Sequence, residues 1–220
     1  MHRQGTDPEA PSPAEPSLAE TMRLLDPLGY GAHYAELAGN LRSLAGPPRS
    51  VVVTGAGEGV GCSSVCLGLG GALAGMGLRA AVLDCDLQRP RLHKMLGEPN
   101  FTGLTTALES DAEPAECGHE PVPGLLVLPT GPIPESPVQS LEDMGLTRMV
   151  GGLREVHDVV LLDAPSYGGV RSSPVLSGGF DGVLLVVHST RTGRKAAREA
   201  AESLEEAGAE LLGVVLNGHP

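Results

Sequence analysis

The chain has 220 residues, which is enough for one sizeable domain with a buried core. Its formal net charge of −12 disfavours nucleic acid as a partner, because an acidic surface repels phosphates. The longest apolar runs are too short to span a bilayer, and the N-terminus lacks the apolar core of a signal peptide. We therefore expect a cytoplasmic protein.

The N-terminal part of the chain divides into two segments by composition. Residues 1–17 are rich in Pro, Glu and Ser, which predicts a disordered tail. Residues 18–48 predict a helical segment with two short helices, at 18–28 and 31–45. We expect residues 49–220 to form a single α/β domain.

From residue 49 onward, short apolar runs alternate with segments long enough for helices. The runs are continuous, as expected for strands that are buried on both faces. Strands are predicted at 50–55, 79–84, 124–129, 158–163, 181–188 and 212–217, and helices at 62–77, 138–156 and 192–208, the last capped by Gly208. The acidic stretch 109–120 is predicted to be a solvated loop. This order is typical of a doubly wound α/β domain with a mostly parallel sheet.

The stretch "AGEGVGCSS" (56–64) follows the first predicted strand and has the character of a phosphate-binding loop. Glycines let successive backbone N–H groups point inward at the start of a helix, which makes a nest for anions. The P-loop pattern G-x-x-x-x-G-K-[ST] would start at Ala56 and place its lysine at Cys62 and its hydroxyl at Ser63. The predicted nucleotide-binding residues of this loop are Gly57, Glu58, Gly59, Val60, Gly61, Cys62, Ser63 and Ser64.

Cys62 is the departure that matters most for chemistry. The lysine of a P-loop offsets charge that develops during phosphoryl transfer, and a thiol cannot. A position at a helix N-terminus lowers the pKa of a thiol, so a redox switch is one interpretation, although a small residue that fills the site is favoured. The four cysteines show no zinc-ligand spacing, and we expect no disulfide.

A dinucleotide-binding loop is a further possibility, but it fits poorly. Its third glycine would fall on Val60 or on Cys62. Asp84 nevertheless follows at a strand end, where a ribose-binding acid is found in such proteins, so this interpretation stays open.

Acidic residues follow two of the predicted strands. Alternation along an extended segment places Asp84 and Asp86 on one side, and Asp163 ends another strand. Three carboxylates at one edge of a sheet suit a hydrated Mg²⁺ and an activated nucleophile, so all three are candidate catalytic residues. The alternative is that Asp84 and Asp86 cap a helix that begins near residue 89.

Four motifs together resemble one family. They are "VLDCDLQRPRLHKMLG" (82–97), "NFTGLTTAL" (100–108), "LLVLPTGPIPESPVQSL" (125–141) and "VVLLDAP" (159–165). From about residue 32 to its end, the chain resembles the cytoplasmic P-loop domain of bacterial tyrosine kinases of capsular and exopolysaccharide biosynthesis. That family is related to the MinD/ParA ATPases.

The resemblance implies roles for particular residues. Ser63 would ligate Mg²⁺, Asp163 would hold the metal through water and Asp86 would help to bind it. Asp84 would be a candidate base, and Asn217 would face the adenine of ATP or ADP. The implied partner is a membrane polysaccharide co-polymerase, which would recruit the protein to the inner face of the membrane.

The chain also departs from that family. Cys62 replaces the loop lysine, and Gln88 replaces an arginine that follows the second acid of the Asp-x-Asp motif. Ala32, Ala35 and Ala38 occupy the places of the family's E-x-x-R-x-x-R motif, so the ring-shaped octamer is in doubt. No tyrosine cluster is present, because the only tyrosines are Tyr30, Tyr34 and Tyr167.

These departures favour a kinase-like protein with impaired catalysis that acts by binding. The second interpretation is a working ATPase or kinase in which Arg89, Arg191, Arg194 or a partner's basic residue supplies the missing charge. The third is an unrelated use of the fold, although the signature lysine of MinD/ParA-type proteins is absent near Gly57.

Overall fold

The structure, a computed structural model, describes residue 29 and residues 31–110, 112–134, 141, 145–166 and 179–218. The predicted tail at 1–17 and the predicted helix at 18–28 lie outside the described residues, as do Tyr30 and Tyr167. The domain boundary near residue 48 stays a prediction.

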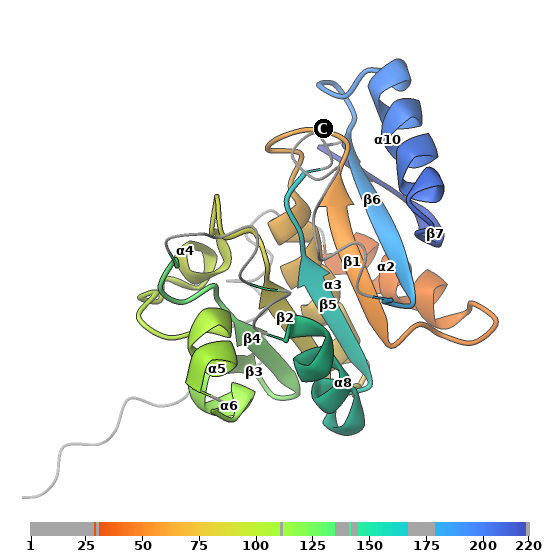
Figure 1. The fold of residues 1–220 in the computed structure, drawn as a ribbon. Coiled ribbons are helices and arrows are strands. Elements are labelled where there is room, and N and C mark those ends of the chain that lie inside the picture. The colour runs from red at the N-terminus through yellow and green to blue at the C-terminus, as the bar shows by residue number, and fades with distance from the viewer. Residues whose placement is uncertain are drawn as a thin grey trace, which may run out of the picture.

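The described part of the chain forms a seven-stranded sheet in the order β3-β4-β2-β5-β1-β6-β7 (Figure 1). The strands are β1 (Ser50–Gly55), β2 (Ala80–Asp84), β3 (His119–Val122), β4 (Leu125–Leu128), β5 (Val159–Asp163), β6 (Gly182–His188) and β7 (Leu211–Asn217). Every pairing is parallel except that of β3 with β4. The predicted fold class and its six strands are confirmed, with ends that shift by a residue or so.

Helices cover both faces of the sheet, as Figure 1 shows. The helices are α2 (Gly31–Arg42), α3 (Cys62–Gly75), α4 (Leu92–Leu96), α5 (Leu104–Ser110), α6 (Pro114–Cys117), α8 (Leu146–Val156) and α10 (Arg194–Glu206). Among these described helices, none has the length and apolar character that a membrane span requires. Gly208 ends α10 with a φ of 81°, and its N–H donates to the Glu205 carbonyl at 2.9 Å, as a C-terminal glycine should.

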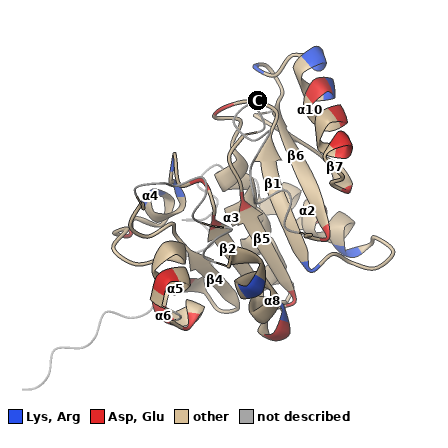
Figure 2. Ribbon diagram, in the orientation of Figure 1, with Lys and Arg blue, Asp and Glu red and all other residues tan. Residues whose placement is uncertain are grey.

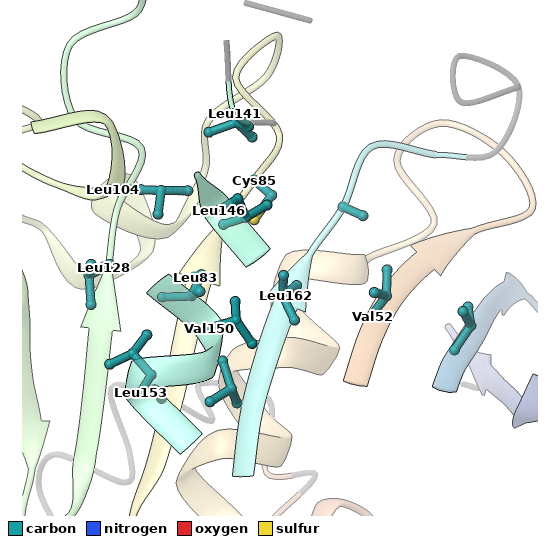
Figure 3. Close-up of a cluster of buried hydrophobic side chains, with 14 of the residues drawn as sticks. Val52, Leu83, Cys85, Leu104, Leu128, Leu141, Leu146, Val150, Leu153 and Leu162 are labelled. Carbon is teal, nitrogen blue, oxygen red and sulfur yellow. The ribbon is translucent and has the colours of Figure 1, made fainter. Parts of the chain in front are cut away.

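Two aliphatic cores lie on the two sides of the sheet. On one side, Leu146, Val150 and Leu153 of α8 pack against Leu83 and Leu162 of the central strands (Figure 3). On the other side, α3 packs against the central strands and α2 packs against α3, through residues that include Ala38 and Leu73. Because α3 begins directly at the end of the glycine-rich loop, the second core fixes the position of that loop.

The prediction of a solvated loop at 109–120 is confirmed for its exposure but wrong about the loop. This stretch contains the end of α5, the whole of α6 and the start of β3. Short elements at a sheet edge offer few periodic positions, so the sequence signal was weak. Among the described residues of this stretch, Cys117 is the buried one, at 5% exposed. The Glu120 carboxylate accepts the Gly124 N–H at 2.8 Å, which closes the β3–β4 turn.

Gly103 allows a close approach between two loops. A Cβ atom at this position would lie 2.2 Å from the Pro129 carbonyl oxygen and 2.5 Å from the Gly131 nitrogen. Both obstacles are backbone atoms, and the neighbouring Leu104 N–H donates to the same Pro129 carbonyl at 2.8 Å. This contact joins the start of α5 to the end of β4.

We predict that Gly103→Ala destabilises the protein by about 2 kcal/mol or more, because backbone must move to admit the methyl group. The matched control is Gly151→Ala on the exposed face of α8, where no atom lies within 4 Å of the added Cβ. That change should stabilise by about 0.5 kcal/mol through helix propensity. Urea unfolding of both variants measures the difference, and equal stability would contradict the packing argument.

Candidate functional site

The site forms where the carboxyl ends of three adjacent parallel strands meet. Asp163 of β5 is in register with Val53 of β1 on one side and with Asp84 of β2 on the other. The glycine-rich loop that leaves β1 therefore lies beside both carboxylates. Figure 2 shows these acidic strand ends at the same edge of the sheet as the basic positions near α4.

The glycine-rich loop is held by contacts from the far end of the chain. Gly59 and Gly61 have φ values of 65° and 99°, which favour glycine. The Asn217 side-chain amide donates to the Val60 carbonyl at 2.8 Å, and Arg191 donates to the Gly59 carbonyl at 2.6 Å. These bonds fix the backbone of the loop through two of its carbonyls.

A pocket of about 300 Å³ lies between this loop, the segment after β2 and the end of β5. It is lined by Gly59, Val60, Gly61, Cys62, Ser63, Ser64, Asp86, Arg89, Arg91, Lys94, Met95, Asp163, Ala164 and Ser166. Most of the residues expected from the sequence therefore share one cavity. Gly57, Glu58, Asp84 and Asn217 are not among its lining residues. Three of them bond to residues that are, since Glu58 pairs with Arg89, Asp84 accepts the Arg91 N–H and Asn217 donates to the Val60 carbonyl.

Asp163 is almost completely buried, at 1% exposed. Burial and the charges of Asp84 and Asp86 raise its pKa well above the usual range, although a hydrogen bond with Ser63 acts in the opposite direction. Its Oδ2 atom is buried and has no hydrogen-bond partner in the described part of the chain. An unpaired carboxylate oxygen beside a cavity is a position for a cation.

The two acids of "DCD" have different environments. Asp84 is fully buried and accepts the backbone N–H groups of Arg91 and Leu92 at 3.1 Å each and that of Asp86 at 3.3 Å. Burial raises the pKa of Asp84 to about 7, against these hydrogen bonds. The alternative that these acids cap a helix therefore applies to Asp84, because its hydrogen bonds fix the start of α4. Asp86 lines the pocket and accepts the Arg89 N–H at 3.1 Å.

The expectation of a lowered thiol pKa at Cys62 is wrong. Burial, followed by the negative charge of Asp163, raises the pKa of Cys62 to about 12, although its position at the helix N-terminus supplies a backbone hydrogen bond that lowers it. The low dielectric and the adjacent carboxylate outweigh that contribution. Cys62 is therefore a neutral thiol at ordinary pH, which removes the basis for a redox switch.

Basic residues at the pocket rim include two that sequence reasoning missed. Arg91, the residue that precedes α4, and Lys94 within α4 both line the cavity. Arg89 also lines it, but its guanidinium forms an ion pair with Glu58 of the glycine-rich loop. The missed pair had little signal in the sequence, because α4 has only five residues.

The donor set of the pocket fits Mg²⁺. Within the described residues no cluster of three His, Cys, Asp or Glu side chains forms a metal site. Mg²⁺ does not need one, since it binds through one or two carboxylates together with water and substrate phosphates. The free Oδ2 of Asp163, the Asp86 carboxylate and the Ser63 hydroxyl are oxygen donors of that kind.

Comparisons with known proteins agree with this geometry. Residues 51–219 match the CbiA family, described as the CobQ/CobB/MinD/ParA nucleotide binding domain. The tyrosine-protein kinase YwqD of Bacillus subtilis is 31% identical over 173 residues, which cover 77% of this chain and 72% of YwqD. The chain belongs to the bacterial tyrosine-kinase branch of this nucleotide-binding family. The resemblance inferred from the motifs is therefore confirmed.

Two solved structures support the fold assignment. The chimerical protein CapA2B2 superposes with a TM-score of 0.82 at 25% identity, covering 91% of this chain and 90% of that one. Cobyrinic acid a,c-diamide synthase of Mycobacterium smegmatis, solved with bound ADP and magnesium, has a TM-score of 0.63 at 20% identity. The superposition covers 77% of this chain and 74% of the synthase chain, and at this identity it shows a shared fold alone.

We predict that the protein without ligand loses stability as pH rises from about 4 to 8. The pKa of Asp84 is raised from 3.8 to about 7 and that of Asp163 is also raised, so the folded state binds more protons than the unfolded state in this range. Asp163→Asn removes one of the buried charges. Its melting temperature at pH 8 should exceed that of the native protein by ~5 °C, with a flatter dependence on pH.

The control is Glu205→Gln on exposed α10, which should follow the native curve. An Asp163→Asn variant that melts lower than the native protein at pH 8, with an unchanged slope, would show that Asp163 has a stabilising partner.

Proposed function

We propose that this protein is a nucleotide-binding member of its family with impaired phosphoryl transfer, which acts in polysaccharide biosynthesis through protein contacts. The observation that carries the proposal is the neutral Cys62 thiol at the place of the P-loop lysine, lining a pocket that is otherwise intact. Nucleotide binding needs an anion nest and metal ligands, whereas phosphoryl transfer also needs a fixed cation. We infer that this pocket supports binding but lacks the cation for transfer.

The residues present are suited to binding a nucleotide with its metal. Backbone N–H groups at Gly61 and beyond form an anion nest at the start of α3. Ser63, Asp86 and Asp163 would hold Mg²⁺, which when bound would neutralise phosphate charge. The side chain of Asn217, predicted to face the adenine, already holds the Val60 carbonyl and would keep the loop in shape.

Transfer makes a stricter demand. Charge that builds on the phosphoryl oxygens must be offset by a fixed cation, and electrostatic stabilisation of this kind is commonly the largest contribution to catalysis. A thiol with a pKa of about 12 contributes no charge. The Asp84 carboxylate, the candidate base, is buried and accepts three backbone N–H groups, so it is poorly placed to accept a substrate proton.

The partner in this proposal is the cytoplasmic face of a membrane polysaccharide co-polymerase. The support is membership of the tyrosine-kinase branch, whose resemblance to this chain extends through the motifs from residue 82 to 165. Recruitment by that partner would bring the protein to the inner face of the membrane. Nucleotide occupancy of the pocket would then regulate the contact without group transfer.

A working ATPase or tyrosine kinase is the second candidate function. The observation that favours it is the basic rim of the pocket, formed by Arg89, Arg91 and Lys94. A cation from this rim would have to supply the charge that the Cys62 thiol lacks.

We predict that Cys62→Lys binds ADP with Mg²⁺ at least about tenfold more tightly than the native protein, whose own binding is weak. The added ammonium would make charge-assisted contacts with the phosphates. Calorimetric titration measures both affinities, and Cys62→Ala is the control for a change of packing without charge. If native protein and Cys62→Lys bind equally well, the thiol is not what limits the site, and the second candidate gains.

A further inference from the structure

We propose that Arg91 supplies the phosphate-binding cation of the pocket, in place of the lysine that Cys62 replaces. This inference rests on the proposed nucleotide site and names the residue that makes it bind a diphosphate. Arg91 is the residue that precedes α4, and its side chain lines the pocket together with Cys62 and Asp163.

The three arginines that the sequence offered for this role are excluded by their positions. Arg89 is paired with Glu58, so its charge is largely neutralised. Arg191 donates to the Gly59 carbonyl at 2.6 Å and thereby supports the loop from its outer side. Arg194, on α10, is not among the residues that line the cavity.

Arg91 differs from these residues because it lines the cavity and no ion pair in the described part of the chain holds its guanidinium. Its backbone is fixed, however, because its N–H donates to the buried Asp84 carboxylate at 3.1 Å. The side chain thus extends from an anchored position and retains its hydrogen-bonding capacity for a ligand.

The electrostatics of the pocket favour this role. The charge of Arg91 lowers the pKa of both Asp86 and Asp163, so its field reaches the acids at the base of the cavity. The orphan Oδ2 of Asp163 is an independent indication of a ligand there, since a buried acceptor needs a cation or donor. An anion at the loop would lie between the N–H nest and the guanidinium, and a planar guanidinium can bind two phosphate oxygens at once.

Lys94 is a weaker candidate for the same role. It lines the pocket from the turn of α4 that follows Arg91, but a flexible ammonium binds phosphate with less geometric definition. We propose that Lys94 adds positive charge at the rim of the pocket without a defined contact to phosphate. The experiment below compares the two residues.

The experiment is a double-mutant cycle read by calorimetric titration with ADP and Mg²⁺. The proteins are the native chain, Arg91→Gln, Cys62→Lys and the variant with both changes. We expect Arg91→Gln to weaken ADP binding about tenfold in the native background. In the Cys62→Lys background it should weaken binding only about twofold, because the lysine then supplies the charge.

Two control variants and a second probe sharpen the result. Lys94→Gln should cost less than Arg91→Gln, and Arg79→Gln, at an exposed pair with Asp158 outside the pocket, should have no effect. Inorganic pyrophosphate should show the same loss on Arg91→Gln as ADP, which places the contact on phosphate and not on the nucleoside. Melting curves of each variant verify folding.

The outcomes separate this inference from the proposed function. If the native protein binds ADP and Arg91→Gln binds it equally well, or if the losses in the two backgrounds are equal, Arg91 does not replace the lysine. If only Cys62→Lys binds, the Arg91 inference fails, and of the proposed function only the impaired transfer stands, because the native pocket then binds no nucleotide. If neither binds, the nucleotide site itself is refuted and both proposals fail.

Discussion

The site depends on a pair of buried carboxylates on adjacent strands. Asp84 and Asp163 are in register at the carboxyl ends of β2 and β5, and both are almost fully buried. Burial raises the pKa of both carboxyls, and the charge of Asp84 raises the pKa of Asp163 further. The pair is therefore stable only with a bound proton, a metal ion or a nearby cation. The backbone around Asp84 and the pocket beside Asp163 reflect this requirement.

The chain satisfies the two carboxylates differently. Asp84 is surrounded by backbone N–H groups, which join the end of β2 to the start of α4. Asp163 keeps one oxygen without a partner in the described residues, next to the loop where a P-loop lysine would have stood. Replacing that lysine by Cys62 removes a counter-charge from the base of the pocket and leaves the cations of the rim to act. Structural support and ligand binding are thus divided between the two acids.

Much of this arrangement follows from the sequence, and the failures have physical causes. The central strands were predictable because burial on both faces makes them continuous apolar runs. The strand β3 was missed because it is a short edge strand that contains Pro121 and has only Val122 buried. The loop glycines and the three acids were singled out because they follow predicted strands, and the strand register places Asp84 beside Asp163.

Other features depend on contacts that are distant in sequence. Alternation placed Asp84 and Asp86 on one side, but β2 ends at Asp84 and the pattern ends with it. The thiol of Cys62 was expected to be acidic from its helix position, whereas its burial and its neighbour Asp163 reverse the direction. Arg91 and Lys94 gave no signal, because their role comes from the position of α4 beside the loop and not from periodicity.

The central claim is that the pocket binds nucleotide but transfers phosphoryl groups poorly because no cation stands at residue 62. Its most direct test is a single-turnover measurement of ATP cleavage, with protein in excess over labelled ATP and saturating Mg²⁺, for the native protein and Cys62→Lys. The account predicts that Cys62→Lys cleaves bound ATP at least about a hundredfold faster, since a fixed cation contributes several kcal/mol to such a transition state. Equal and rapid cleavage by the native protein would contradict the account and establish a working ATPase.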